Sequence, residues 1–360
     1  LGYDAMLLFA QESMYWLTGY DTFGFCFFQC LLVRRDGQMS LLTRSADLRQ
    51  AQLTSIIEDI HIWTDRADAN PTRNLRDLMD ERELLGAKVG VEYDTHGLTG
   101  ANARLLDATL KTFATLEDAS HVIGLLRAEK SPAEIAYIRQ AALLGDAAFQ
   151  AALDNTRAGA DEGAILAAMH QAIFAGGGDY PGNAFILGPG AEALLCRYKS
   201  GRRKLDHQDQ LTLEWAGVYR HYHVAYMQTI PIGSATPRHG ALYEAAHEAL
   251  LACRAAMVVG ASFGDVFDAH ARIMEEHGLA AHRLNACGYS LGARFAPSWM
   301  DQPMFYRDNP VVIKQNMVLF AHMIIMDSET GTAMTLGRTY LTGEDGAEDL
   351  SKIPLSLIVR

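Results

Sequence analysis

The stretch from Leu211 to Thr229 (LTLEWAGVYRHYHVAYMQT) constrains most what this chain can fold into. It contains two apolar runs of strand composition, and the first of them carries a single carboxylate, Glu214. The pair Ala216-Gly217 predicts a turn between the runs, so we expect two adjacent antiparallel strands. A lone acid among apolar neighbours is costly to bury unless it is paired, hydrogen-bonded or used in chemistry. Glu214 is therefore either a structural acid held by backbone N–H groups or part of a functional site.

The composition is that of an ordinary globular protein, with 49% hydrophobic and 21% charged residues among 360, enough for two domains. The formal net charge of −12 argues against nucleic acid and anionic membranes as partners. No apolar run reaches the roughly 20 residues that a membrane-spanning helix needs. The five cysteines are scattered and form no C-x-x-C pair, which predicts buried thiols in a reducing cytoplasm.

The chain divides into two regions with different patterns. Residues 1–125 alternate short apolar runs with helical periodicity, which is typical of a small α/β domain. At Ser131-Pro132-Ala133-Glu134 the residue order predicts a helix N-terminus with a capping box. Residues 126–360 show two helices, two strands, two further helices and a closing hairpin that turns near Thr330-Gly331. We therefore expect an α+β fold in which helices cover one face of a curved antiparallel sheet.

Several chemically useful side chains fall on strands or loops at the edges of this predicted sheet. They are Arg197, Glu214, Tyr222, His223 and Tyr289. A carboxylate beside a histidine and tyrosine hydroxyls can perform nucleophilic or general acid–base catalysis. His221 and His223 would share a strand face and could bind a metal, but no carboxylate accompanies them. The glycine run 176–178 before Asp179-Tyr180 either ends a helix or approaches a ligand, and residues 201–204 form a basic turn.

The chain resembles the creatinase/prolidase family over essentially its whole length. The resemblance rests on Ser131 to Ile135, on the two-strand stretch with Tyr222 and Thr229, on Gly288-Tyr289-Ser290-Leu291-Gly292, and on Leu341 to Gly346. It implies a small N-terminal domain, a pita-bread domain and a homodimer.

The resemblance also bears on metals, because metallopeptidases of this family hold two metal ions with two Asp, one His and two Glu. The matching positions here are Glu214, Ala225, Tyr289, His322 and Gly337. One carboxylate cannot hold a dinuclear site. The sequence therefore predicts no metal, no other cofactor and no metallopeptidase activity.

Within the family, the chain is most similar to the metal-free ectoine hydrolases. The shared motifs are Trp16 to Asp21 (WLTGYD), Gly177 to Pro181 (GGDYP), Glu214 to Gly217 (EWAG, resembling EIAG), Tyr222-His223, and Gly288 to Gly292 (GYSLG, resembling GYPIG). This resemblance implies metal-independent hydrolysis of a C–N bond in a small amidine or guanidino-type solute. It implies Glu214 as nucleophile or base, with His223 and Tyr289 handling protons. The implied substrate-binding residues are Asp179, Tyr180, Arg197, Tyr222, Trp299 and His322.

Some positions depart from the ectoine hydrolase pattern. Arg197 stands where those enzymes and creatinase place a histidine; an arginine stays protonated and cannot act as a base, but it could bind a substrate carboxylate. Gln228 and Thr335 replace an arginine and a glutamate. These changes indicate either a different substrate or lost catalysis. The alternatives are a creatinase-type amidinohydrolase, a non-catalytic binding module, or a metal enzyme with His221, His223 and His322 as ligands.

Overall fold

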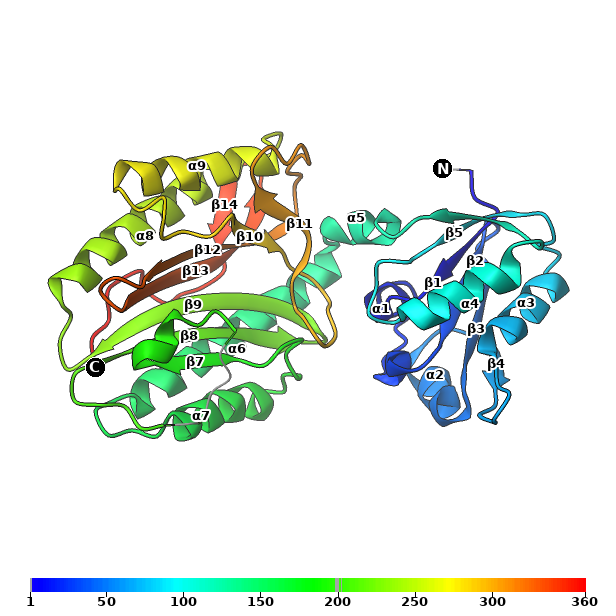
Figure 1. Ribbon diagram of the computed structural model, residues 1–360, viewed down its shortest axis with the longest axis horizontal. Helices are drawn as coiled ribbons and strands as arrows, with labels where there is room; N and C mark the ends of the chain where they lie inside the picture. Colours follow the sequence, from blue (N-terminus) through cyan, green and yellow to red (C-terminus); the bar gives the residue numbers. More distant parts are fainter. Residues whose placement is uncertain (1, 198–200, 202) are drawn as a thin grey trace. The chain divides into compact units, whose positions relative to one another are not determined.

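The computed structural model describes residues 2–197, 201 and 203–360. The chain forms two compact units, residues 1–127 and 128–360 (Figure 1). The basic turn predicted over residues 201–204 lies partly outside the described residues. Among the helices that the structure describes, none is long and apolar enough to cross a membrane.

The first unit is a six-stranded mixed sheet with helices on both faces. The strands lie in the order β4-β3-β2-β1-β5-β6, with β1 antiparallel to β2 and parallel to β5. They are β1 (Ala5–Leu8), β2 (Cys30–Arg34), β3 (Met39–Arg44), β4 (Asp59–Trp63), β5 (Lys88–Val91) and β6 (Thr115–Asp118). The helices are α1 (Gln11–Thr18), α2 (Leu48–Thr54), α3 (Pro71–Glu81) and α4 (Gly100–Leu110), and α5 (Val122–Ala128) spans the boundary between the units.

Successive residues of β1 enter two separate hydrophobic cores, one on each face of this sheet. Leu7 packs with Leu75 of α3 and Leu106 of α4. Leu8 packs in the other core with Met14 of α1. Because helices bury both faces, the strand is continuously apolar rather than alternating. This arrangement confirms the predicted α/β character of the N-terminal region.

The second unit is built on one antiparallel sheet with strand order β11-β10-β12-β13-β9-β8-β7, and β14 pairs with β13. The strands are β7 (Ile186–Pro189), β8 (Asp209–Tyr219), β9 (Tyr222–Ile232), β10 (Ala286–Ser290), β11 (Asp301–Tyr306), β12 (Val318–Asp327), β13 (Thr332–Gly343) and β14 (Gly346–Asp349). The hairpin of β12 and β13 confirms the predicted closing hairpin. The two long hairpins meet at the centre of the sheet, where β9 pairs with β13.

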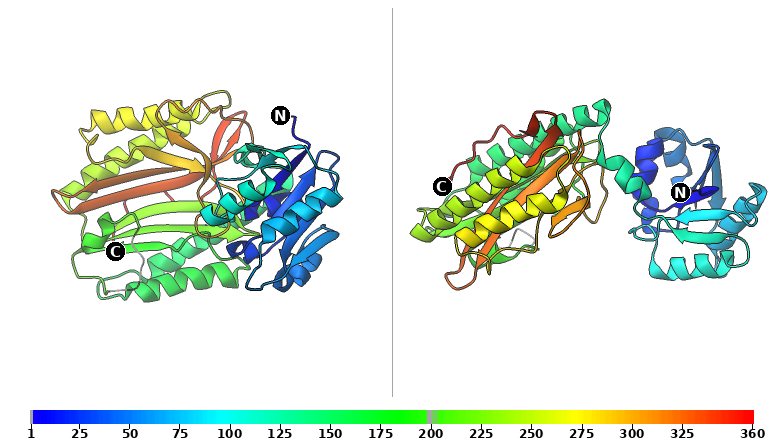
Figure 2. Two further views of the ribbon diagram at one scale, coloured as in Figure 1. Left: turned by 45° about the vertical axis from the view of Figure 1, so that its right-hand side comes forward. Right: turned by 90° about the horizontal axis from the view of Figure 1, so that it is seen from above.

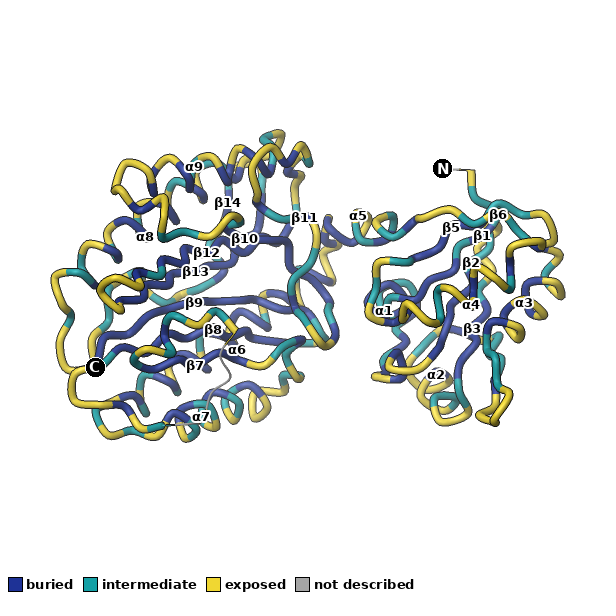
Figure 3. The backbone as a smooth tube through the Cα atoms, viewed as in Figure 1, coloured by how far each residue is buried: buried dark blue, intermediate teal, exposed yellow. Residues whose placement is uncertain are grey.

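Two pairs of helices cover this sheet. They are α6 (Pro132–Asn155) with α7 (Glu162–Ala175), and α8 (Pro237–Ala256) with α9 (Phe263–Glu276). α6 packs on β8 and β9, and α8 packs on β12 and β13 (Figure 2). The Ser131 side chain and Glu134 form the capping box that the sequence predicts at the start of α6. The central strands are buried along most of their length, whereas the helices expose their outer faces (Figure 3).

The turn predicted at Ala216-Gly217 is wrong. β8 continues to Tyr219, and the two-residue turn is Arg220-His221, with φ values of 50° and 62°. Gly217 is a glycine for a different reason: a Cβ there would lie 1.8 Å from the Ala141 carbonyl oxygen of α6. It permits a close helix–sheet contact and does not bend the chain. His221 consequently lies in the turn and not on a strand beside His223.

Candidate functional site

Glu214 lies in a row of residues that crosses the centre of the second unit's sheet. Glu214 pairs with Met227 on β9, Met227 pairs with Gly337 on β13, and Gly337 pairs with His322 on β12. Residues directly opposite on paired strands project to the same face of a sheet. The four residues therefore share one face, which we call the Glu214 face.

The helices cover the other face of the sheet. Trp215, the residue after Glu214, donates a hydrogen bond from its indole N–H to the Gly145 carbonyl of α6 at 2.9 Å. Tyr226, next to Met227, donates from its hydroxyl to the Ala142 carbonyl at 2.9 Å. Because successive strand residues alternate between faces, Glu214 and Met227 point away from α6.

The Glu214 carboxyl is almost completely enclosed. Its residue is 7% exposed, and no described residue donates a hydrogen bond to it. Burial raises the pKa of Glu214 to about 7, and the positive charge of Arg197 opposes part of this rise. A carboxyl group with this pKa can both accept and return a proton near neutral pH.

Tyr289 of β10 is held beside this carboxyl by Trp299. The Trp299 indole N–H donates to the Tyr289 hydroxyl oxygen at 2.9 Å, and both side chains are buried. Burial and the negative charge of Glu214 raise the pKa of Tyr289 well above its usual value. The phenol therefore keeps its proton. Since its oxygen already accepts from Trp299, that proton is available for donation.

His322 lies at the other end of this row from Glu214. Its ring centroid lies 5.6 Å from that of Tyr289 and 5.5 Å from that of Phe320, so two aromatic rings hold it in place. The residue is 7% exposed, and its Nδ1 has no hydrogen-bond partner among the described residues. Burial lowers the pKa of His322 to about 4, with a smaller contribution from Arg197. The imidazole is thus neutral at pH 7.

Gly337 and Phe320 occupy the middle of the Glu214 face as a matched pair. A Cβ on Gly337 would lie 2.7 Å from Cζ of Phe320 and 3.0 Å from Cβ of Met227. The Phe320 ring thus fills the space that a side chain at position 337 would need. Sequence reasoning missed Phe320 and Met227, because both lie in apolar strand patterns that also fit an ordinary core.

Arg197 follows the short helix η3 (Gly190–Leu194) and is exposed. Its positive charge lowers the pKa values of Glu214, Tyr289 and His322. Arg197 is therefore close enough to act on the predicted site residues from three different strands. Its guanidinium supplies a positive charge at the exposed end of a buried acidic site.

His223 lies on the Glu214 face but away from Glu214. It pairs with Val218, four residues further along β8, which corresponds to about 13 Å along the strand. Its Nε2 accepts a hydrogen bond from the Gly182 N–H at 2.9 Å. Burial lowers the pKa of His223 to about 3. The structure thus gives His223 a fixed backbone partner and does not place it beside Glu214, contrary to the sequence-based expectation.

Three of the predicted substrate-binding residues make contacts away from Glu214. Tyr222 projects to the helix side, where its hydroxyl donates to the Glu134 carboxylate at 3.0 Å. Asp179 accepts a hydrogen bond from the His221 N–H at 3.3 Å and thereby supports the β8–β9 turn. Tyr180 is 80% exposed and packs edge-on against Phe174. Each of these side chains has a structural contact that accounts for its position.

The residues of the Glu214 face do not fit the two metal ions of the family's metallopeptidases. At the five matching positions, Ala225 and Gly337 offer no ligand atom, and the space at Gly337 is filled by Phe320. No group of three or more His, Cys, Asp or Glu suited to a metal occurs in the described part of the chain. The three-histidine alternative also fails, because Nε2 of His223 is already bonded to Gly182.

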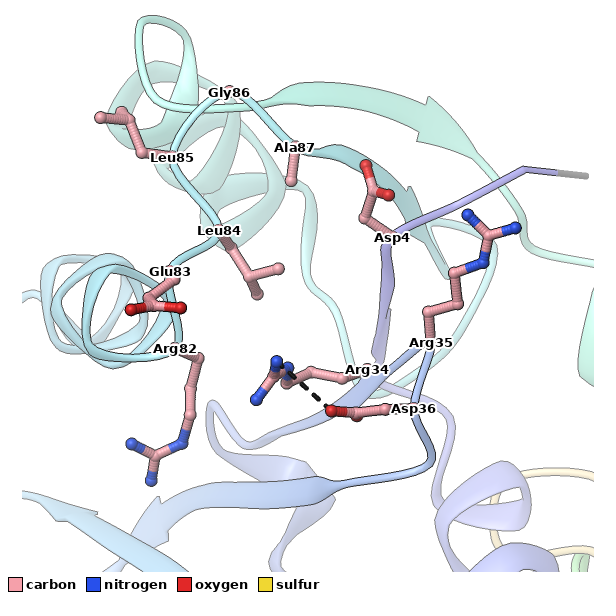
Figure 4. A pocket seen from close by; sticks show the side chains of 10 residues that line it. All are labelled: Asp4, Arg34, Arg35, Asp36, Arg82, Glu83, Leu84, Leu85, Gly86 and Ala87. Atoms are coloured by element: carbon pink, nitrogen blue, oxygen red, sulfur yellow. Dashed lines mark ion pairs between the residues drawn. The ribbon is translucent and has the colours of Figure 1, made fainter.

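A separate surface pocket of about 590 Å³ lies in the first unit (Figure 4). It is lined by Asp4, Arg34, Arg35, Asp36 and residues 82–87. Arg34 pairs with Asp36 at 3.3 Å, and Arg82 pairs with Asp59 at 2.6 Å. Two of the three arginines that line this pocket therefore already have acidic partners.

Comparisons with known proteins agree with this architecture. A family model described as metallopeptidase family M24 matches residues 136–344, and one described as the creatinase/prolidase N-terminal domain matches residues 1–129. The ectoine hydrolase of Halomonas elongata is 24% identical, with 100% of this chain and 93% of that protein covered. The Xaa-Pro dipeptidase of Pyrococcus furiosus is 24% identical, with 70% of each chain covered.

Solved structures show the same fold. A recombinant prolidase from Thermococcus sibiricus superposes with a TM-score of 0.88 at 18% identity, covering 100% of this chain and 95% of that one. A dipeptidase from Pyrococcus horikoshii superposes with a TM-score of 0.86 at 20% identity, covering 100% of this chain and 96% of that one. Since the M24 model spans more than half of the sequence, this chain belongs to metallopeptidase family M24 and has its α+β pita-bread fold.

Proposed function

We propose that this chain is a metal-independent hydrolase that breaks a C–N bond in a small amidine or guanidino-type compound. The observation that carries the proposal is the Glu214 carboxyl, an enclosed acid whose pKa burial raises to about 7, on a face where metal ligands are missing. A structural acid would be satisfied by neighbouring donors, and no described residue donates to this one. Similarity to an ectoine hydrolase over the whole chain supports the proposal.

An amidine suits this site because it carries its own positive charge. An amidinium carbon is electrophilic without a Lewis acid, whereas a peptide carbonyl needs polarisation by a metal or an oxyanion hole. The ionised Glu214 carboxylate pairs with the amidinium and takes a proton from the attacking water, or attacks the carbon itself. When Glu214 has acted as the base, the protonated carboxyl then donates that proton to the departing nitrogen, and the C–N bond breaks. The products are an amide and an amine.

Two further residues support a small, zwitterionic substrate. In this proposal the exposed Arg197 guanidinium, whose charge acts on Glu214, binds a substrate carboxylate while the amidinium lies against Glu214. The Tyr289 hydroxyl, oriented by Trp299, can donate a hydrogen bond to the oxygen that forms at the reacting carbon. Enclosure of Glu214, Met227 and His322 favours a compact substrate over a peptide.

The proposal is tested with the purified full chain and a panel containing ectoine, creatine and acetamidine. Product formation is followed by NMR and mass spectrometry, with and without prior metal removal by a chelator. We expect turnover of at least one member, no loss of rate after chelation, and a kcat about 100-fold or more lower in Glu214→Gln.

Glu248→Gln is the matched control, because Glu248 is a surface residue of α8 paired with His277 at 2.8 Å. It should keep the wild-type rate. Loss of activity on chelation, restored by a divalent metal, would contradict the proposal. Absence of turnover and of thermal stabilisation by every compound in the panel would favour a non-catalytic binding module instead.

A further inference from the structure

Hydrolysis of an amidinium requires more proton transfers than one carboxylate can perform at once. When water adds to the carbon, Glu214 takes one of its protons. When the intermediate collapses, Glu214 returns that proton to the departing nitrogen, and the newly formed hydroxyl loses its own proton as it becomes the amide carbonyl. A second proton acceptor must therefore face the reacting carbon at the moment when Glu214 acts as an acid.

Most described polar groups on the Glu214 face cannot accept this proton. Arg197 is permanently protonated, and Tyr289 holds its proton because burial and Glu214 raise its pKa. His223 uses its acceptor nitrogen for the Gly182 N–H. A neutral imidazole has one acceptor nitrogen, so His223 has none left.

The threonine hydroxyls on this face are also engaged. Thr229 lies within 3.2 Å of the Thr212 hydroxyl and 3.1 Å of the Thr335 hydroxyl. Thr339 donates to the Ala225 carbonyl at 2.8 Å. These bonds hold the β9–β13 junction together and leave the centre of the face without a free hydroxyl acceptor among the residues described.

His322 is placed differently. It belongs to the same transverse row as Glu214, three strands away, or about 14 Å between the two Cα atoms in a flat sheet. Both side chains project from the same face, and Met227 and the Phe320 ring that covers Gly337 lie between them in the row. No hydrogen bond joins the imidazole to another described residue. Its ring packs against Tyr289 and Phe320, and its Nδ1 has no hydrogen-bond partner among the described residues.

We propose that His322 is the second proton-handling residue of this site. It faces Glu214 from the opposite end of the row, takes the hydroxyl proton as the intermediate collapses to the amide, and passes that proton to the amine product. The sum is amidinium plus water giving amide plus ammonium, with Glu214 and His322 returned to their starting states. This inference rests on the proposed function, which supplies the reaction but assigns no residue to the second proton.

The first test compares His322→Ala with the wild-type chain on whichever panel member is turned over. We expect kcat to fall about 100-fold or more while KM changes by less than about fivefold, and added imidazole to restore part of the lost rate. A residue that only supports the fold would not respond to free imidazole. His270→Ala is the matched control: His270 is a buried histidine of α9, on the helix side of the sheet, with an unpartnered Nδ1. It should stay within about twofold of wild type.

Retention of kcat within about threefold in a folded His322→Ala chain, or no response to imidazole, would overturn the assignment while leaving the proposed function standing. A second measurement covers the opposite case, in which no compound is turned over. Acetamidinium chloride is added to the full chain labelled with ¹⁵N-histidine, and the His322 signal is identified by its loss in His322→Ala. We expect the ring nitrogens of His322 to shift and those of His277, which pairs with Glu248 at the surface, to stay. A shift without turnover would reject the hydrolase but keep His322 in the ligand site, and no shift would reject His322.

Discussion

At the level of single residues, the packing at the centre of the Glu214 face depends on Gly337 having no side chain. Gly337 has an ordinary extended backbone in β13, and nothing in its conformation demands glycine. What demands it is the Phe320 ring, whose Cζ would lie 2.7 Å from an added Cβ. The strand stays well packed at this position because a neighbouring aromatic ring fills the space.

Gly337→Ala should therefore destabilise the second unit by about 1–3 kcal/mol through overpacking. Phe320→Leu, which removes the ring, should cost a similar amount through the cavity it leaves. The two changes should compensate: the double variant is expected to lose about 1 kcal/mol less than the sum of the single losses. Urea unfolding of the four chains measures this coupling. Strict additivity would mean that the ring and the glycine do not depend on each other.

At the level of secondary structure elements, the position of one turn decides which residues meet Glu214. In a hairpin the turn sets the register, and a shift of one residue moves every side chain to the other face. With the turn at Arg220-His221, the partner of Glu214 is Met227, and Tyr222 and His223 point to opposite sides. A turn at Ala216-Gly217 would pair different residues of the two strands, and the register predicted from it differs from the observed one. This is why the sequence predicted a strand around Glu214 but did not predict that His223 lies further along the hairpin and that Tyr222 points to the helix side.

The turn escaped prediction because its chemistry is unusual. Both turn residues have positive φ, a conformation that normally selects asparagine, aspartate or glycine. Arginine and histidine give no such signal, whereas Gly217 gives a false one. Other elements carried regular signals and were predicted correctly: the Ser131 capping box and the β12–β13 hairpin both formed as expected. Tyr289, Trp299 and His322 were predicted as site residues from the family resemblance, because the periodicity of the sequence does not distinguish them from core residues.

Gly217→Ala tests the role of this glycine in the contact between α6 and β8. The added Cβ would lie 1.8 Å from the Ala141 carbonyl oxygen and 2.4 Å from the Gly145 nitrogen, both backbone atoms that cannot rotate away. We expect a loss of more than about 3 kcal/mol in unfolding free energy, or failure to accumulate as soluble protein. Gly240→Ala in α8 is the control, because nothing lies within 4 Å of its added Cβ. It should stabilise the chain by about 0.5–1 kcal/mol. Similar behaviour of the two variants would contradict the close-contact role of Gly217.

At the level of the whole molecule, the two units contain buried titratable groups of opposite kinds. In the first unit, burial raises the pKa of Glu92 to about 7, even though Ser13 and the Phe9 and Ala10 N–H groups donate to it. In the second unit, burial lowers the pKa values of five described histidines, to about 3 for His223 and His270, to about 4 for His322, and in the same direction for His170 and His239. Glu214 and Asp349, whose pKa values are raised, oppose these histidines in part.

These shifts predict opposite pH dependences of stability for the two units. Between about pH 4.5 and 7 the unfolded chain ionises Glu92 but the folded chain does not, so the first unit should lose about 2–3 kcal/mol as the pH rises. Between about pH 4 and 6.5 the unfolded chain protonates its histidines but the folded chain does not, so the second unit should gain stability over that range. The buried histidines outweigh the opposing carboxyls, because each of the three most strongly depressed pKa values contributes about as much as Glu214.

Hydrogen exchange at increasing denaturant, analysed by mass spectrometry, reports the opening free energy of each unit separately. At about pH 5 the second unit should open more easily than at about pH 7, and the first unit should open less easily. Glu92→Gln should remove most of the pH dependence of the first unit, because an amide does not ionise, while lowering its stability at about pH 5 through the lost acceptor oxygen. A second unit that does not gain stability between about pH 5 and 7 would show that the buried histidines become protonated without unfolding. The neutral state assigned to His322 would then be wrong, and with it the acceptor role proposed for that residue.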